Sequence, residues 1–354
     1  MKPWGREGPT GPRADALEDL ADAGIELDPP SPADRARART SGEPDEPHDH
    51  DDAEPHAHPH VHSRLDSPPI VGIVGAGAVG TALGVALSRA GWPIQAVASR
   101  DAGRRERFRS LVPGVRAFAE ANAILDEVEL VIVAVPDDAI PSVAGRLHLY
   151  SGQAIVHTSG LLGADALSPA MAAGTQIGAF HPLVAFADTE RAVAALHGAT
   201  IAIEGDDQLL DLLARMAEAI GGVPVRLAPG AKKAYHAAAM LAAGGLVALL
   251  DAIAELGRVA GLDEAGSLAV YGPLMEQTLG NARTIGIRAA LTGPLTRGDV
   301  GTLNAHLAEL RSHAPGVLEL YLALARRELA LAEARGALAP EGAELVRRSL
   351  ANPV

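Results

Sequence analysis

The chain of 354 residues is long enough for two ordinary domains, and 48% of its residues are apolar, as in soluble globular proteins. It contains no cysteine, which excludes disulfides, thiolate metal sites and a cysteine nucleophile and fits a reducing compartment. The formal net charge is −14 and only 3% of the residues are aromatic, which argues against a nucleic-acid partner.

The sequence gives no sign of a membrane or secreted protein. Its first residues lack the apolar region of a signal peptide. The longest apolar run, Ala237 to Leu250, has 14 residues, whereas a membrane span needs about 20. We therefore expect a cytoplasmic protein without a membrane partner.

Residues 1–67 are predicted to form a disordered, acidic, His-rich tail, because Pro, Asp, Glu, Gly and His dominate them. Imidazoles interleaved with carboxylates can bind Ni, Zn or Cu ions weakly. The simpler interpretation is a solvated low-complexity tail with incidental metal affinity. The histidines of this tail are His48, His50, His56, His58, His60 and His62.

From residue 68 the pattern changes to short apolar strands that alternate with helices. Strands are predicted within residues 70–77, 94–100, 128–136, 153–160, 175–182, 199–205 and 223–227. Continuous apolar strands of this kind predict a parallel sheet buried on both faces. We assign residues 68–227 to an α/β domain of the Rossmann type.

After residue 227 the strands stop and long Ala/Leu-rich helical stretches follow, with breaks at 261–263, 293–294 and 314–315. Residues 228–354 are therefore predicted to form a second, all-helical domain. The folded part shows no Asp, Glu and His spacing typical of a metal site, so no metal is predicted there.

The stretch "GAGAVG" places Gly75, Gly77 and Gly80 between an apolar strand and a helix. In this spacing the first glycine permits a tight turn, the second lets the backbone approach a pyrophosphate, and the third lets the helix pack on the strand. With the intervening Ala78 and Val79, these residues are predicted to bind a dinucleotide.

The end of the next strand indicates which dinucleotide binds. An NAD site usually has a carboxylate there, but this chain has Ser99 and Arg100, with Arg104 and Arg105 nearby. A hydroxyl and a guanidinium suit the 2′-phosphate of NADP, so NADP is the predicted cofactor. The alternatives are NAD, or arginines that merely begin a solvated helix.

Three further strands end in residues that can face the cofactor. Val135 and Pro136 end one of them, where the nicotinamide could lie. Ser159 and His181 follow the next two, and we predict that both bind substrate. His157 is a further candidate to line the same pocket.

The stretch "KKAYHAAA" places Lys232 and His236 four residues apart, on one face of a helix. Reduction of a carbonyl builds negative charge on its oxygen, which a cation and a general acid can stabilise and protonate. Lys232 and His236 are the predicted catalytic pair. The plainer alternative leaves Lys232 exposed to solvent. Tyr235 is expected to point elsewhere, into a core or an interface.

The stretch "TGPLTRGD" adds two more polar candidates. Arg297 could grip a substrate carboxylate with two hydrogen bonds, or it could pair with an acidic residue such as Asp299. Asp299 is well placed to cap the helix that follows. We predict that Arg297 binds substrate and that Asp299 has a structural role.

These motifs, together with "VIVAVPDDAI", "VHTSG" and "AFHPL", resemble those of Rossmann-like proteins that carry a DUF2520 domain. The resemblance covers about Ile70 to Leu331, and the family is similar to pyrroline-5-carboxylate reductases. Some members act as alternative ketopantoate reductases. The resemblance implies NADPH, a 2-oxo-acid-like substrate and a homodimer formed through the helical domain.

This chain departs from the family at one point. Relatives usually carry an Asn further along the "YHAAA" helix, where this chain has Ala243, Gly244 and Gly245. The predicted activity is NADPH-dependent reduction of a small ketopantoate-like 2-oxo acid or an imine acid. The alternatives are an NADP-binding regulatory protein without turnover, or metal handling through the His-rich tail.

Overall fold

The structure, a computed structural model, describes residues 67–186, 188–228 and 230–351. Residues 1–66 of the predicted tail, with all of its histidines, lie outside the described residues. The chain divides into two compact units, of which the first ends at Ala239 and the second begins at Met240. This division lies inside a long helix, twelve residues beyond the domain boundary that we placed at 227.

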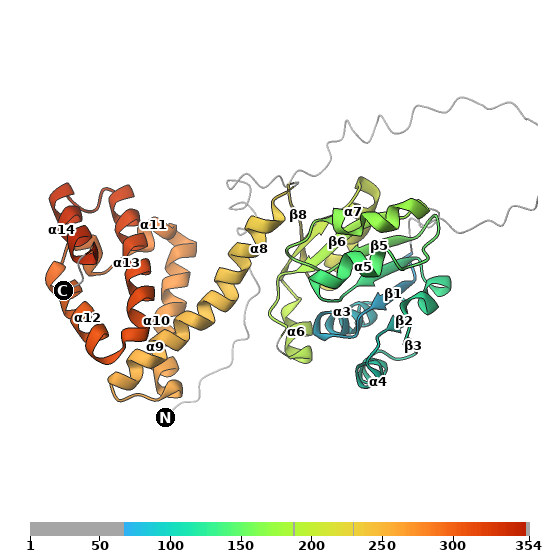
Figure 1. Cartoon of the computed structure of the whole chain (residues 1–354), viewed down its shortest axis with the longest axis horizontal. Coiled ribbons are helices and arrows are strands. Elements are labelled where there is room, and N and C mark those ends of the chain that lie inside the picture. Colours follow the sequence, from blue (N-terminus) through green and yellow to red (C-terminus); the bar gives the residue numbers. More distant parts are fainter. Residues whose placement is uncertain (1–66, 187, 229, 352–354) are drawn as a thin grey trace, which may run out of the picture. The chain divides into compact units, whose positions relative to one another are not determined.

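The first unit is built on one eight-stranded sheet in the order β3-β2-β1-β4-β5-β6-β7-β8, with helices along it (Figure 1). The strands are β1 (Val71–Val74), β2 (Ile94–Ala98), β3 (Arg116–Phe118), β4 (Leu130–Val133), β5 (Ala154–His157), β6 (Gln176–Pro182), β7 (Thr200–Glu204) and β8 (Val223–Arg226). The three central strands β1, β4 and β5 are buried at every residue, which explains why they contain no polar side chain except His157 at the end of β5.

Helices and 3-10 turns connect the strands and bury both faces of the sheet. They are α3 (Ala78–Arg89), α4 (Ala102–Leu111), η2 (Ala121–Glu127), η3 (Asp137–Ala139), α5 (Ile140–Ala144), η4 (Ala164–Ala173), α6 (Thr189–Ala195) and α7 (Asp207–Ala219). A further helix, α8 (Lys232–Met240), follows the last strand, β8. One core cluster packs α3, α4 and α7 against the sheet, and a second packs η2, α5 and η4 against it. The predicted α/β class is confirmed.

The direction of the last strands corrects one expectation. We predicted a parallel sheet, but β7 pairs antiparallel with β6, and β8 runs parallel to β7. Pro182, which ends β6, pairs with Ile201 at the start of β7. The segment between these two strands therefore begins and ends at the same edge of the sheet and does not cross over it. A buried strand is apolar in either direction, and the sequence pattern therefore could not distinguish the two.

The second unit is entirely helical over its described residues, as predicted (Figure 1). It comprises η5 (Leu241–Gly245), which is a π-helical turn, α9 (Leu246–Val259), α10 (Glu264–Ile285), α11 (Ile287–Ala290), η6 (Pro294–Arg297), α12 (Val300–His313), α13 (Pro315–Ala334) and α14 (Pro340–Ala351). Leucines such as Leu303, Leu307 and Leu329 form a core between α12, α13 and α14. This unit therefore has a core of its own.

Aspartates start many of these helices. In each case the side chain precedes the first helical residue and accepts a hydrogen bond from a backbone N–H of the first turn, which is the usual N-cap arrangement. These N-caps are Asp101, Asp188, Asp206, Asp263 and Asp299. The capping role predicted for Asp299 is confirmed, since it accepts from the backbone and the hydroxyl of Thr302.

One helical run, Lys232–Val259, is long and apolar enough to cross a membrane by length and composition alone. The run nevertheless contains Asp251, Glu255 and Arg258, and its first residue is buried in the first unit. Charges inside a span are costly in hydrocarbon. The most apolar window of this run is only 11% buried in the structure, so most of its apolar surface has no partner among the described residues.

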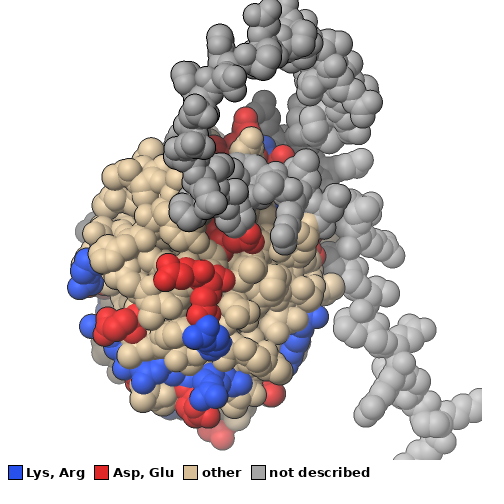
Figure 2. Space-filling model, turned by 90° about the vertical axis from the view of Figure 1, so that its right-hand side faces the viewer, with Lys and Arg blue, Asp and Glu red and all other residues tan. Residues whose placement is uncertain are grey.

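Charged side chains of opposite sign lie close together on the face of the molecule in Figure 2, over a largely uncharged surface. Ion pairs of the first unit include Arg109 with Glu106 and Arg226 with Asp211. Such exposed pairs contribute little stability, roughly 0–1 kcal/mol each.

Candidate active site

The glycine loop lies at the switch point of the sheet, where β1 stands between β2 and β4. Gly75 has a φ of +111°, and a Cβ there would lie 2.2 Å from the carbonyl oxygen of Ala134. A Cβ on Gly80 would lie 2.0 Å from the carbonyl oxygen of Gly75. A Cβ on Gly77, in contrast, would meet nothing within 4 Å. Two glycines are thus required by the protein itself, and the middle one borders open space.

The start of α3 completes this cradle. Its N-cap is Gly77, which offers no capping side chain, and its first turn contains no acidic residue. The first backbone N–H groups of the helix, including those of Ala78 and Val79, therefore have no capping side chain, and the positive end of the helix dipole is not neutralised. This arrangement fits a pyrophosphate.

The loop after β2 carries the residues predicted to select the cofactor. Asp101 caps α4, and the neighbouring Arg104 lies 3.7 Å from it. The guanidinium of Arg105 donates to the backbone carbonyls of Ser99 and Arg100. Arg104 and Arg105 thus hold the loop, which leaves the exposed Arg100 as the cation that a 2′-phosphate could engage.

Val135 and Pro136 follow β4 and lie beside the glycine loop. A Cβ on Gly75 would be 3.2 Å from Cγ1 of Val135. Pro136 is exposed and has a φ of −52°. The structure therefore places both residues at the edge where we predicted the nicotinamide.

Ser159, which follows β5, is buried at the centre of a hydrogen-bond network. Its hydroxyl donates to Oδ2 of Asp137 at 2.8 Å and accepts from the backbone N–H groups of Leu161 and Leu162. One hydroxyl can donate once and accept twice, so its capacity is filled. This favours a role for Ser159 in holding the loop over direct contact with a substrate.

Lys232, the first residue of α8, is only 3% exposed. Its Nζ donates to the backbone carbonyl of Ser159 at 2.8 Å. Burial lowers the pKa of Lys232, while the carboxylates of Glu204 and Asp137 oppose that shift. The structure thus disagrees with the plainer alternative of a solvated lysine, because the ammonium group lies inside the first unit.

His157 is fully buried and both of its ring nitrogens are engaged. Nδ1 accepts from the backbone N–H of Ser159 at 3.1 Å, and Nε2 lies 2.9 Å from the carbonyl oxygen of Gly163. These partners fit the neutral tautomer that carries its proton on Nε2. Burial lowers the pKa of His157 to about 4. His157 therefore fixes the loop after β5 and is not free to transfer protons.

His181 and His236 come together against Gly160. A Cβ on Gly160 would lie 2.6 Å from Nε2 of His181 and 2.6 Å from Nδ1 of His236, so only glycine lets both rings approach the chain. The ring centroids are 6.2 Å apart. The pKa of His181 falls to about 4, mainly through burial and then through the charges of Lys232 and His236.

Tyr235 belongs to this cluster, contrary to our expectation that it points elsewhere. Its ring packs edge-on against His181, with centroids 5.8 Å apart. Tyr235 is three residues after Lys232, so these two residues share a helical face, and this spacing could have revealed the position of Tyr235. Sequence reasoning likewise gave no role to Asp137 or Gly160.

Three buried polar atoms of this cluster have no hydrogen-bond partner: Nδ1 of His181, the hydroxyl of Tyr235 and Nδ1 of His236. An unsatisfied buried polar group costs about 1–3 kcal/mol, so a concentration of them indicates a binding site for a polar ligand. The pKa of Tyr235 is raised by burial, which keeps the hydroxyl protonated and able to donate.

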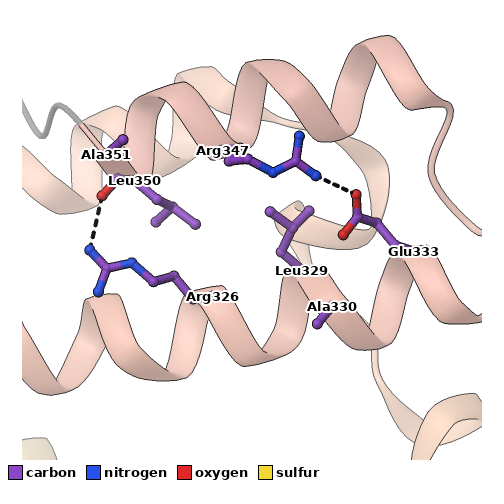
Figure 3. Close-up of a pocket in the computed structure, with 7 residues that line it drawn as sticks. All are labelled: Arg326, Leu329, Ala330, Glu333, Arg347, Leu350 and Ala351. Carbon is purple, nitrogen blue, oxygen red and sulfur yellow. Dashed lines mark hydrogen bonds and ion pairs between the residues drawn. The ribbon is translucent and has the colours of Figure 1, made fainter.

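Arg297 lies in η6 of the second unit and is exposed, and its role in binding stays a prediction. The second unit also has a depression between α13 and α14 (Figure 3). Its arginines are already engaged, Arg347 with Glu333 and Arg326 with the carbonyl oxygen of Leu350. We interpret this depression as a packing groove and not as a ligand site.

The match to known families agrees with this architecture. Residues 57–182 match the Rossmann-like domain, and residues 199–328 match DUF2520, a domain of unknown function. The chain thus carries a Rossmann-like domain followed by a DUF2520 domain, and the resemblance stated from its motifs is confirmed. No curated protein matches this chain in sequence.

Solved structures share the fold. A protein from Thermotoga maritima is 27% identical, with a TM-score of 0.59, and the match covers 75% of this chain and 99% of that one. A candidate NADP oxidoreductase from Bacteroides fragilis is 22% identical, with a TM-score of 0.62 and coverage of 74% and 98%. Pyrroline-5-carboxylate reductase from Streptococcus pyogenes is 16% identical, with a TM-score of 0.53 and coverage of 75% and 99%.

Proposed function

We propose that this protein is an NADPH-dependent reductase that acts on a small 2-oxo acid, ketopantoate-like, or on an imine acid. The observation that carries the proposal is the buried Lys232, which lies on the first helix after the sheet together with His236, whose ring lies near His181 of β6. Similarity in fold to an NADP oxidoreductase and to pyrroline-5-carboxylate reductase supports the same class of reaction.

When bound, NADPH supplies the hydride for such a reduction. The glycine loop would hold its pyrophosphate, and Ser99 with Arg100 would contact the 2′-phosphate. The ammonium group of Lys232 would stabilise the negative charge that grows on the substrate oxygen. His236 would donate the proton that the product needs, and His181 would orient the substrate. Arg297 remains our candidate to bind the substrate carboxylate.

The test uses the full chain, NADPH and a panel of 2-oxo acids and cyclic imine acids, with ketopantoate first. We expect NADPH absorbance to fall with at least one acceptor, and NADPH to bind more tightly than NADH. The proposal fails if nucleotide binds but no acceptor is reduced at millimolar concentration, or if no nucleotide binds.

One observation favours an alternative, a regulatory protein that binds NADP without turnover. The resemblance implies an Asn in the region of Ala243, Gly244 and Gly245, and the π-helical turn Leu241–Gly245 offers no polar side chain there. This alternative predicts tight NADPH binding with unchanged nicotinamide absorbance for every acceptor in the panel. Metal handling by the tail would instead be lost, with NADPH binding kept, on removal of residues 1–66.

We also propose a homodimer that forms through the second unit in the cytoplasm. Large apolar side chains on α9 and α10 are exposed, including Val247 at 65% and Leu274 at 59%. Exposed apolar side chains in such number on two neighbouring helices favour burial against a second copy. Light scattering should give the mass of a dimer, and Leu274→Glu should shift it toward the monomer.

A further inference from the structure

Asp137 connects to Lys232 through Ser159. The half-buried carboxylate of Asp137 accepts a hydrogen bond from the hydroxyl of Ser159 at 2.8 Å. The carbonyl oxygen of the same serine accepts from Nζ of Lys232 at 2.8 Å. Three segments that are far apart in the sequence, η3, the loop after β5 and α8, are therefore joined by one residue.

The ammonium group of Lys232 has unused capacity. An ammonium group has three N–H donors, and one of them is directed at Ser159. Among the residues that the structure describes, Lys232 makes no direct ion pair with a carboxylate. A carboxylate in direct contact would occupy further donors and neutralise the charge, whereas a carbonyl leaves both available to a ligand.

We propose that Asp137 is the positioning residue of Lys232: its carboxylate fixes Ser159, and Ser159 fixes the ammonium group that meets the substrate. This inference rests on the proposed function of Lys232 as the group that stabilises charge on the substrate. A hydrogen bond to a carboxylate is roughly twice as strong as one between neutral groups, which makes Asp137 a firm anchor.

Other groups around Lys232 also set its charge. Glu204 is the carboxylate with the strongest effect on it, and Asp137 is the second. Glu204 accepts from the backbone N–H of Ala164 and contacts the loop by another route. The imidazoles that face this region are His157, His181 and His236, and the first two are neutral above about pH 4. Of these groups, Asp137 is therefore the one that carries a negative charge and is also linked to Lys232 by hydrogen bonds through Ser159.

The composition of the chain makes a direct measurement possible. It contains only three lysines, Lys2, Lys232 and Lys233, so a protein labelled with 13C-lysine gives three sets of side-chain NMR signals. Lys233→Arg identifies the signal of the exposed neighbour. The signal that then titrates at the lowest pH is expected to be Lys232, since burial lowers its pKa.

Asp137→Asn keeps the shape and one acceptor oxygen but removes the charge, and Asp138→Asn is the matched control at an exposed neighbour. We expect the pKa of Lys232 to fall by about half a unit to one unit in Asp137→Asn and to stay unchanged in Asp138→Asn. An equal pKa of Lys232 in the two folded variants overturns the inference. The pKa measurement needs no substrate, so it tests the inference about Asp137 even if the proposed reaction is not found.

A double-mutant cycle tests the path through Ser159. If Asp137 acts through the serine hydroxyl, Asp137→Asn should lower kcat about tenfold in the wild-type background and about twofold or less in a Ser159→Ala background. The alkaline limb of the kcat profile should move to lower pH in Asp137→Asn. Equal fold-changes in both backgrounds, with an unmoved pH profile, contradict the positioning role.

Discussion

The glycine loop and the cluster around Lys232 lie in the same unit, but they are made in opposite ways. The loop uses six consecutive residues, and what matters is the absence of side chains at Gly75, Gly77 and Gly80. The cluster uses side chains from segments up to about a hundred residues apart, which the sheet brings together. The comparison teaches that the pyrophosphate-binding loop is local, whereas the chemical part of the candidate site depends on the tertiary fold.

The loop can be broken in two distinguishable ways. Gly80→Ala would place a Cβ 2.0 Å from a backbone oxygen, so we expect a loss of about 4 kcal/mol of unfolding free energy and no NADPH binding. Gly77→Ala meets nothing within 4 Å and should keep its stability while losing at least about tenfold in NADPH affinity. Chemical denaturation and nucleotide titration measure both effects. Equal stability of the two variants would contradict this account of the loop.

The cluster is tested by its cation. Lys232→Met keeps the apolar stem and removes the charge, so we expect kcat to fall about 100- to 1000-fold, with NADPH affinity changed by less than about threefold. Lys233→Met, at the exposed neighbour, is the control and should behave as the wild type. Steady-state kinetics and nucleotide titration give the answer. A similar kcat in the two variants would remove Lys232 from the mechanism.

Acid should weaken the network around His157. Its pKa is about 4 in the folded protein and 6.5 in an unfolded chain, so the unfolded state binds more protons between these values. Stability is therefore lost as the pH falls from about 6.5 to about 4, by on the order of 2 kcal/mol from this residue. Denaturation at pH 7 and pH 4.5 measures the loss. His157→Gln should be less stable at pH 7 and less dependent on pH, and an unchanged dependence would refute the assignment.

The smallest expected effect concerns the choice of cofactor. Arg100→Ala should lower NADPH affinity about tenfold and leave NADH affinity unchanged, because only NADPH carries the 2′-phosphate. Arg104→Ala is the comparison, since Arg104 pairs with Asp101 at the start of α4. Titration with both nucleotides checks the prediction. An equal loss of affinity for NADPH and NADH would show that Arg100 does not contact the 2′-phosphate.

The sequence by itself determined the glycine loop, the two-part α/β and helical architecture and the aspartate that caps α12. Each of these features depends on contacts within a few residues or on the period of apolar positions, and both can be recognised in a short stretch of sequence. The shared helical face of Lys232 and His236 likewise follows from their spacing of four residues alone.

Only the tertiary structure decided the rest. It showed that the hydroxyl of Ser159 is committed to Asp137, that Tyr235 packs on His181 and that β7 runs against β6. These facts depend on which segments meet across the sheet, and residues distant in the chain carry no local mark of their partners. The burial of Lys232, which is unusual for a lysine, likewise depends on the folded first unit and cannot be predicted from the neighbouring residues in the sequence.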